Sequence, residues 1–123
     1  MTMQEMALLA LSLLSESEED LNTYDAGVIM REYNILLGEC FDINNSIREA
    51  AGQAPLIEVP HITAMGDTLT YEEKLLRTAL PYGLASAIVF DDDVGKRQIF
   101  RNEYIAACNQ FQKVIPTVIG DVY

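Results

Sequence analysis

Residues suited to catalysis or metal binding are few in this chain of 123 residues. His61 is its only histidine, and a metal site needs several histidine, cysteine or carboxylate ligands. No nucleophile stands at a spacing that pairs it with His61 as its base. The sequence therefore favours a loop histidine and predicts no enzyme, no metal site and no cofactor. An acidic pair that folding brings together remains an open alternative, because such a pair leaves no fixed spacing in a sequence.

The two cysteines and a run of aspartates could also do chemistry. Cys40 and Cys108 each lie among apolar residues at helical spacing, which favours two buried thiols over a disulfide. Residues 91–93 are three consecutive aspartates, but they lack the alternating oxygen ligands and the late glutamate of a calcium loop. We expect Asp92 or Asp93 to cap the helix that follows.

The net charge of the chain limits the classes of molecule that it is expected to bind. The formal net charge of −11 argues against a nucleic-acid-binding regulator, because such affinity comes largely from lysine and arginine on phosphates. Acidic residues concentrate early and basic residues late. The early acidic segment includes Glu18, Glu19 and Asp20. The late basic cluster is Lys96, Arg97 and Arg101. The usual explanation is two solvated faces; the alternative is that the basic cluster contacts the acidic segment of a neighbouring copy.

Apolar periodicity predicts helices in the first half of the chain. Thr2 can cap a short first helix with a buried stripe at three-four spacing, too short to span a bilayer. A second helix is predicted over residues 20–51 and ends before Gly52. Gly38 is expected to be a point at which another part of the chain packs closely against this helix. Asn44 and Asn45 could break the helix locally.

A region rich in helix breakers, residues 53–69, separates the two helical halves and contains a strand candidate at 56–59. Thr70 and Glu73 have the spacing of a capping box, which predicts a third helix from there toward residue 90. Pro81 should kink that helix near Arg77 or break it at Leu80.

Small residues recur at every fourth position of the third helix and would let another helix pack closely against it. They are Ala79, Gly83 and Ala87. A final helix over residues 94–113 should fold back on the third as a helical hairpin. Residues 114–123, which include Val118 and Ile119, are rich in β-branched side chains and are expected to extend against the 56–59 segment or another copy.

Together these elements predict a mainly α fold, a small bundle of about four helices in one domain spanning residues 1–123. Its parts are a first helical half (1–52), a loop with a short β-like segment (53–69), a helical hairpin (70–113) and an extended tail (114–123).

Three stretches of the second half carry a resemblance to a known family. They are the helix "YEEKLLRTALPYGLASAIVF", the turn "DDD" and the helix "KRQIFRNEYIAACNQF". In their order the chain resembles the small helical head-to-tail connector proteins, also called adaptor or neck proteins, of tailed bacteriophages. The first half is similar in having a short apolar helix followed by a long one, but the resemblance is specific only across residues 71–111.

The resemblance implies a structural virion protein made in the host cytoplasm. Such proteins form rings, commonly of twelve copies, beneath the portal protein, where they extend the DNA channel and dock the next neck or tail component. The partners would be other copies, the portal protein and that component, with no membrane and no sequence-specific DNA binding. Excess negative charge around a channel would let DNA slide without sticking. The first helix and the tail would be buried between subunits or against partners.

A second hypothesis is a small acidic binding module or inhibitor that acts on a basic partner. Such a module would spread its carboxylates along one exposed face. In this sequence they concentrate at helix starts and turns, which favours the assembly protein.

Overall fold

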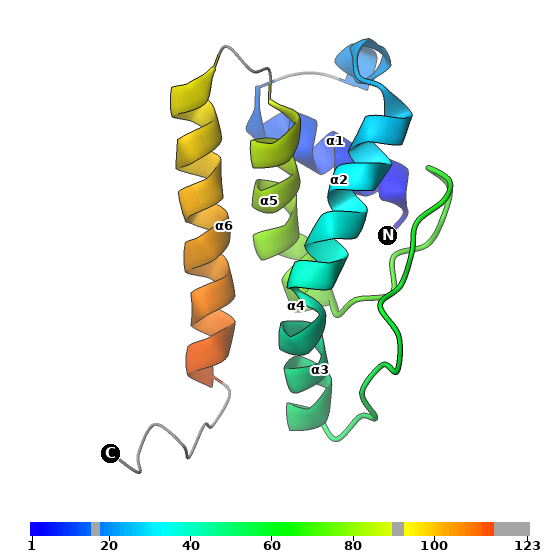
Figure 1. Ribbon diagram of the computed structural model, residues 1–123, viewed down its shortest axis with the longest axis vertical. Coiled ribbons are helices and arrows are strands. Elements are labelled where there is room, and N and C mark those ends of the chain that lie inside the picture. The colour runs from blue at the N-terminus through cyan, green and yellow to red at the C-terminus, as the bar shows by residue number, and fades with distance from the viewer. Residues whose placement is uncertain (16–17, 90–92, 115–123) are drawn as a thin grey trace.

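The computed structural model describes residues 1–15, 18–89 and 93–114, and it is helical over most of them (Figure 1). The elements are α1 (Met3–Leu13), the 3-10 helix η1 (Glu18–Thr23), α2 (Ala26–Glu39), α3 (Phe41–Ala50), α4 (Glu73–Arg77), α5 (Ala79–Ile88) and α6 (Val94–Val114). The prediction of a mainly α bundle is confirmed. About four helices were expected and six are found, because the second and third predicted helices are each interrupted.

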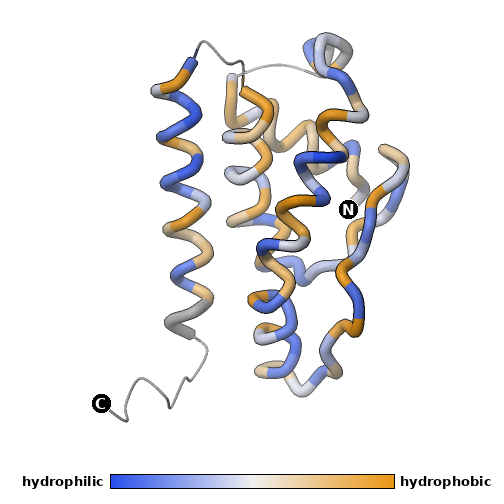
Figure 2. The backbone as a smooth tube through the Cα atoms, in the orientation of Figure 1, coloured by the Kyte–Doolittle hydropathy of each residue, from blue (hydrophilic) through white to orange (hydrophobic). Residues whose placement is uncertain are grey.

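The central helix of the bundle is α5. It packs against α1, α2, α4 and α6, and Leu80, Leu84 and Ala85 are fully buried. Figure 2 shows α5 in orange and pale shades, whereas α6 includes deep blue segments. A helix with neighbours on several sides must be apolar around most of its circumference. This explains why no charged residue occurs between Arg77 and residue 91.

The first helix, α1, begins at the predicted capping residue. Thr2 Oγ1 accepts a hydrogen bond from the Glu5 N–H at 3.2 Å, and Glu5 Oε1 accepts one from the Thr2 N–H at 3.3 Å. The residues buried along its apolar side are Met3, Met6, Ala7, Ala10 and Leu11. Because α1 packs on α5 of the same chain, this side is covered within the subunit, and burial between subunits or against partners is not needed to cover it.

The predicted second helix is not continuous. It divides into α2 and α3 at Cys40, and not at Asn44 or Asn45, which lie inside α3. The hydroxyl group of Tyr71 donates a hydrogen bond to the Leu37 carbonyl, which in an unbroken helix would accept from the N–H four residues later. A side chain that inserts into the helical hydrogen-bond ladder is a recognised cause of such a break.

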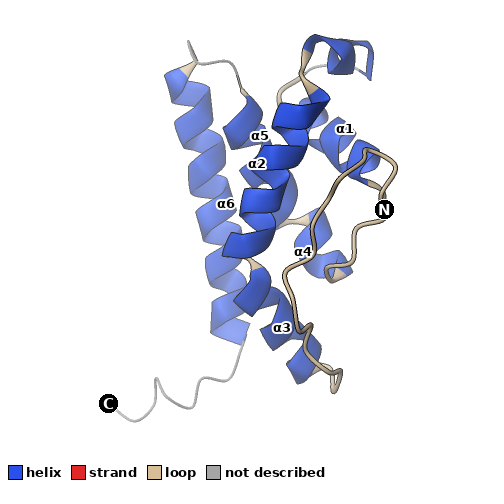
Figure 3. Ribbon diagram, turned by 45° about the vertical axis from the view of Figure 1, so that its right-hand side comes forward, coloured by secondary structure: helices blue, strands red, loops and turns tan. Residues whose placement is uncertain are grey.

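Asparagine side chains hold the long loop after α3 against the helices. Asn45 exchanges two hydrogen bonds with the backbone of Leu56, at 2.7 and 3.1 Å, and Asn34 does the same with Ile62, at 2.8 and 3.0 Å. Figure 3 shows the loop running along one side of α2. The predicted strand at 56–59 is wrong: no strand occurs in the described residues, and Ile57 is 95% exposed. The two asparagine side chains satisfy the backbone N–H and carbonyl groups of Leu56 and Ile62, as the backbone of a neighbouring strand would in a sheet.

The third predicted helix begins later than expected and divides near its proline. The Thr70 capping prediction is wrong, because Glu72 occupies the N-cap of α4, and its N–H donates to Asn44 Oδ1 at 2.8 Å. A kink near Arg77 or a break at Leu80 was predicted; the structure has a break beside Arg77, where α4 ends, and α5 begins after Thr78. Pro81 is then the third residue of α5, a position at which a backbone N–H would have no hydrogen-bond acceptor within the helix.

The last helix, α6, lies beside α5 and forms the predicted hairpin with it (Figure 1). Asp93 Oδ1 accepts from the Lys96 N–H at 3.1 Å, so Asp93 caps the helix as predicted. Where the structure describes the chain, no helix is long and apolar enough to cross a membrane.

Candidate assembly surfaces

The basic cluster of α6 is used inside the subunit. Lys96 Nζ donates to the carbonyl of Leu14 at 3.1 Å, and Arg97 Nη2 donates to that of Val89 at 2.9 Å. These two carbonyls belong to the C-caps of α1 and α5. Arg101 reaches the last residue of α2, with its Nη1 3.5 Å from Glu39 Oε1. Each cation therefore lies at the negative end of a helix dipole.

Sequence reasoning missed this arrangement, although the sequence carries a signal for it. Helices α1, α2 and α5 have no basic residue in their own last turn, so they lack the usual compensation for the carbonyl groups left unpaired there. The cluster on α6 supplies that compensation from another element. These contacts favour a structural role for the cluster over pairing with a neighbouring copy.

A partly buried group of polar side chains joins α2 and α6 beside the Arg101 contact. Tyr104 donates from its hydroxyl to Glu39 Oε1 at 2.8 Å, and the Cys40 Sγ lies 3.1 Å from the same hydroxyl. Because the tyrosine proton is directed to the carboxylate, the Cys40 thiol is the donor in the second contact. Arg101 also stacks over the Tyr104 ring, 4.9 Å from its centroid. This group fixes the middle of α6 to the end of α2.

The environment keeps most of this group protonated. The interaction with Cys108, followed by burial, raises the pKa of Cys40. Burial and then the Cys40 contact raise the pKa of Tyr104. The interaction with Cys40 lowers the pKa of Cys108, which is half-buried. Both cysteines are free thiols as predicted, but only Cys40 is buried, and Cys108 is half-buried.

Replacing Tyr104 with phenylalanine tests the contribution of this group of polar side chains. The change leaves the Cys40 thiol and the Glu39 carboxylate without their shared partner, so we expect the free energy of unfolding to fall by about 1–2 kcal/mol. Urea denaturation measures it. Tyr82→Phe is the matched control, because that ring stacks on Phe100 at 6.1 Å and its hydroxyl makes no hydrogen bond among the described residues. Equal losses for the two variants would contradict the assigned role.

The side of α6 that faces away from α5 is exposed and nearly uncharged. We define the α6 outer face by Ile99, Asn102, Glu103, Ala106 and Asn109, all of which are exposed. Ile99 is 61% exposed, and Glu103 is the one charged member. On a chain with a net charge of −11, such a face is suited to contact another protein surface, because interface centres are depleted of charged residues.

A second exposed face lies on α2. We define the α2 outer face by Val28, Arg31, Ile35 and Gly38, and all four are exposed. Ile35 is 52% exposed, and a side chain added at Gly38 would meet nothing within 4 Å. The prediction that Gly38 is a close-packing point is therefore wrong within the subunit. Beside this face, Arg31 and Ile35 line a groove of about 500 Å³ whose other wall includes His61 of the loop.

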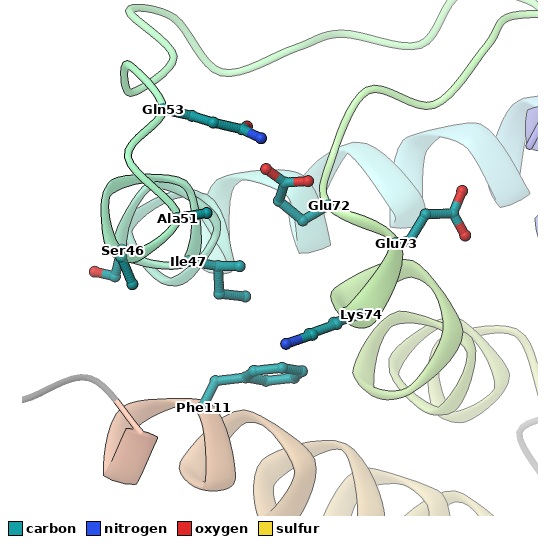
Figure 4. A pocket seen from close by; sticks show the side chains of 9 residues that line it. Ser46, Ile47, Ala51, Gln53, Glu72, Glu73, Lys74 and Phe111 are labelled. Carbon is teal, nitrogen blue, oxygen red and sulfur yellow. The ribbon is translucent and has the colours of Figure 1, made fainter.

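A cavity of about 490 Å³ lies between α3, the start of α4 and the end of α6. Figure 4 shows Lys74 extending toward the ring of Phe111, with Ile47 opposite and the Glu72 carboxylate at another side. Arg48 Nη1 lies 3.7 Å from Glu72 Oε1. The cavity can accommodate an apolar group between one cation and one carboxylate. Among the described residues, no three histidine, cysteine, aspartate or glutamate side chains gather to hold a metal ion.

The remaining residues predicted for close packing or for contacts between subunits lie on α5, in η1 or outside the described side chains. Ala79 is buried, and Ala87 is half-buried at the end of α5. Gly83 lies against α6 and α2, since an added Cβ would be 2.9 Å from Tyr104 Cδ1 and 3.0 Å from Leu36 Cδ2. Asp20 is half-buried in η1. Four predicted contact residues lie outside the described side chains: Glu18, Glu19, Val118 and Ile119.

Comparison of the chain with protein-family models, with curated proteins and with solved structures finds no match.

Proposed function

We propose that this protein is a structural subunit of a tailed-bacteriophage particle, a head-to-tail connector that forms a ring under the portal protein. In this role the ring extends the DNA channel and docks the next neck or tail component. The proposal combines the resemblance of residues 71–111 to connector proteins with the surfaces of the folded subunit. Its partners are other copies of the chain, the portal protein and the downstream component.

The observation that carries the proposal is the α6 outer face. A subunit of an assembly can bury such an exposed, nearly uncharged helix face, because the centres of interfaces are depleted of charged residues. Two copies that each carry a net charge of −11 repel one another at long range. A contact between copies is therefore favoured where the surface charge is lowest. The remaining excess of carboxylates is compatible with a channel that does not bind the DNA backbone.

Electron cryomicroscopy of purified virions tests the proposal directly. We expect the chain to fit a ring of density between portal and tail. Particles in which every neck component is accounted for by other proteins would reject the proposal. Capture of the chain by a single basic cytosolic protein, with none in virions, would favour the acidic binding module instead.

Replacing Ile99 with glutamate is expected to weaken self-association at least tenfold, roughly 1.4 kcal/mol or more, because it places a carboxylate in the centre of the contact. Sedimentation of the purified chain over a concentration series measures the dissociation constant. Ile57→Glu is the matched control, since Ile57 is 95% exposed in the loop and the charge change is the same. Equal dissociation constants for Ile99→Glu and the control would exclude the α6 outer face.

A further inference from the structure

Each outer face has two apolar residues seven positions apart with one charged residue between them. On α2, Val28 and Ile35 are seven residues apart and enclose Arg31. On α6, Ile99 and Ala106 are seven residues apart and enclose Glu103. Residues seven apart lie on the same side of a helix, two turns from one another. Each face is therefore an apolar pair with one charge between its members, and the two charges have opposite sign.

Both faces are open in the subunit. Val28 is 38% exposed and Ile35 is 52% exposed on α2, and Ile99 is 61% exposed on α6. The side chain of Arg31 is 67% exposed, and its ion pair within the subunit joins it to the adjacent Glu32 at 3.4 Å. An exposed pair of this kind contributes little to stability, so Arg31 can pair elsewhere at little cost.

The directions of the helices fit a repeated contact between neighbours in a ring. Figure 1 shows α2 and α6 both running from the top of the molecule toward the bottom. In a ring of many subunits, each neighbour is turned by only a small angle. The α6 helix of one copy then runs nearly parallel to the α2 helix of the next, whereas an isologous dimer would make such helices antiparallel when they lie across the two-fold axis.

We propose that the α6 outer face of one copy packs in parallel against the α2 outer face of the next copy. Residues that differ by 71 in number lie opposite one another, so that Val28 faces Ile99 and Ile35 faces Ala106. Arg31 then lies opposite Asn102, and Glu103, the next residue along α6, is the carboxylate with which we expect Arg31 to pair. The inference rests on the proposed ring and names the surfaces that form it.

The pairing gives Gly38 a role that it does not have in the isolated subunit. Gly38 lies in the last turn of α2 on its exposed side. It has no neighbour within 4 Å of an added Cβ, so no contact within the subunit requires a glycine there. In the proposed register Gly38 faces Asn109, and the missing side chain lets the two helices approach. The contact also joins two different surfaces, and such heterologous contacts generate closed rings or filaments where isologous ones stop at a dimer.

A paired-cysteine variant tests the register. In the full-length chain, Ile35→Cys and Ala106→Cys are combined, and the purified protein is oxidised and separated on a non-reducing gel. We expect a ladder of covalent oligomers that extends beyond the dimer, because each copy contributes one cysteine to each of its two neighbours. The two single variants are the controls: each has one engineered thiol, so a bond between engineered thiols gives a dimer at most, and a longer ladder from a single variant would come from Cys40 or Cys108.

Dimers alone, or no ladder from protein whose engineered thiols react with maleimide, would overturn the inference. Charge reversal gives an independent measurement: Arg31→Glu and Glu103→Arg should each weaken self-association about tenfold, and the double variant should recover to within about threefold of the unmodified chain. No recovery would likewise overturn the Arg31–Glu103 pairing. A ring seen in virions without the ladder would retain the proposed function and reject only this contact.

Discussion

Replacing Leu84 with alanine is expected to lower the free energy of unfolding by about 2–5 kcal/mol, the range for a buried leucine that leaves a cavity. Leu84 is fully buried on α5, which packs against four other helices. A loss of this size is a large fraction of the roughly 5–15 kcal/mol that stabilises a typical domain. Urea or thermal denaturation followed by circular dichroism measures it.

The matched control for Leu84→Ala is Leu9→Ala on α1. Leu9 is 38% exposed, so the same truncation there removes less contact area, and we expect a loss of about 1 kcal/mol or less. If the two variants lost the same amount, α5 would not be the centre of the core.

Replacing Gly83 with alanine is expected to destabilise the fold by about 1–3 kcal/mol, although alanine is the better helix former. The added methyl group would lie 2.9 Å from Tyr104 Cδ1 and 3.0 Å from Leu36 Cδ2. Tyr104 cannot yield easily, because its hydroxyl group is bonded to Glu39 and Cys40. The measurement is chemical denaturation at a protein concentration too low for self-association.

Gly38→Ala is the matched control, because it makes the same change inside a helix where nothing lies within 4 Å of the new Cβ. At low concentration this variant should be unchanged or more stable by up to about 1 kcal/mol. A gain from Gly83→Ala would mean that α5 and α6 are further apart than described.

Much of the fold follows from local sequence signals. The capping box at Thr2, the charge-free α5 and the cap at Asp93 each depend on residues within a few positions of one another, and each was predictable. Pro81 also acted locally, and the break near Arg77 appeared where the proline excludes an uninterrupted helix.

The incorrect predictions concern contacts between distant residues. Asn44 and Asn45 were interpreted as helix breakers because asparagine competes for backbone groups, yet they bond to the backbone of Glu72 and Leu56 from inside α3. The actual break, at Cys40, is accompanied by a hydrogen bond from Tyr71, 34 residues away from its acceptor Leu37. No local pattern contains that information.

The candidate surfaces were only partly predictable. The basic cluster was identified from the sequence, but its partners at three helix ends depend on how α6 crosses the bundle. The spacing of Val28, Arg31 and Ile35 was present in the sequence and was not recognised. These three residues are exposed because the opposite side of α2 packs on α5, and that packing cannot be read from the sequence.

The three cations of α6 also determine when the fold can be completed during synthesis. Lys96, Arg97 and Arg101 bind at the ends of α1, α5 and α2, all of which leave the ribosome before α6 does. Until then, the side of α5 that meets α6 is uncovered, and three helix ends lack their positive charge. The nascent chain therefore remains short of its native structure until its last helix emerges, and premature termination before residue 94 would release a product with exposed apolar surface that is prone to aggregate.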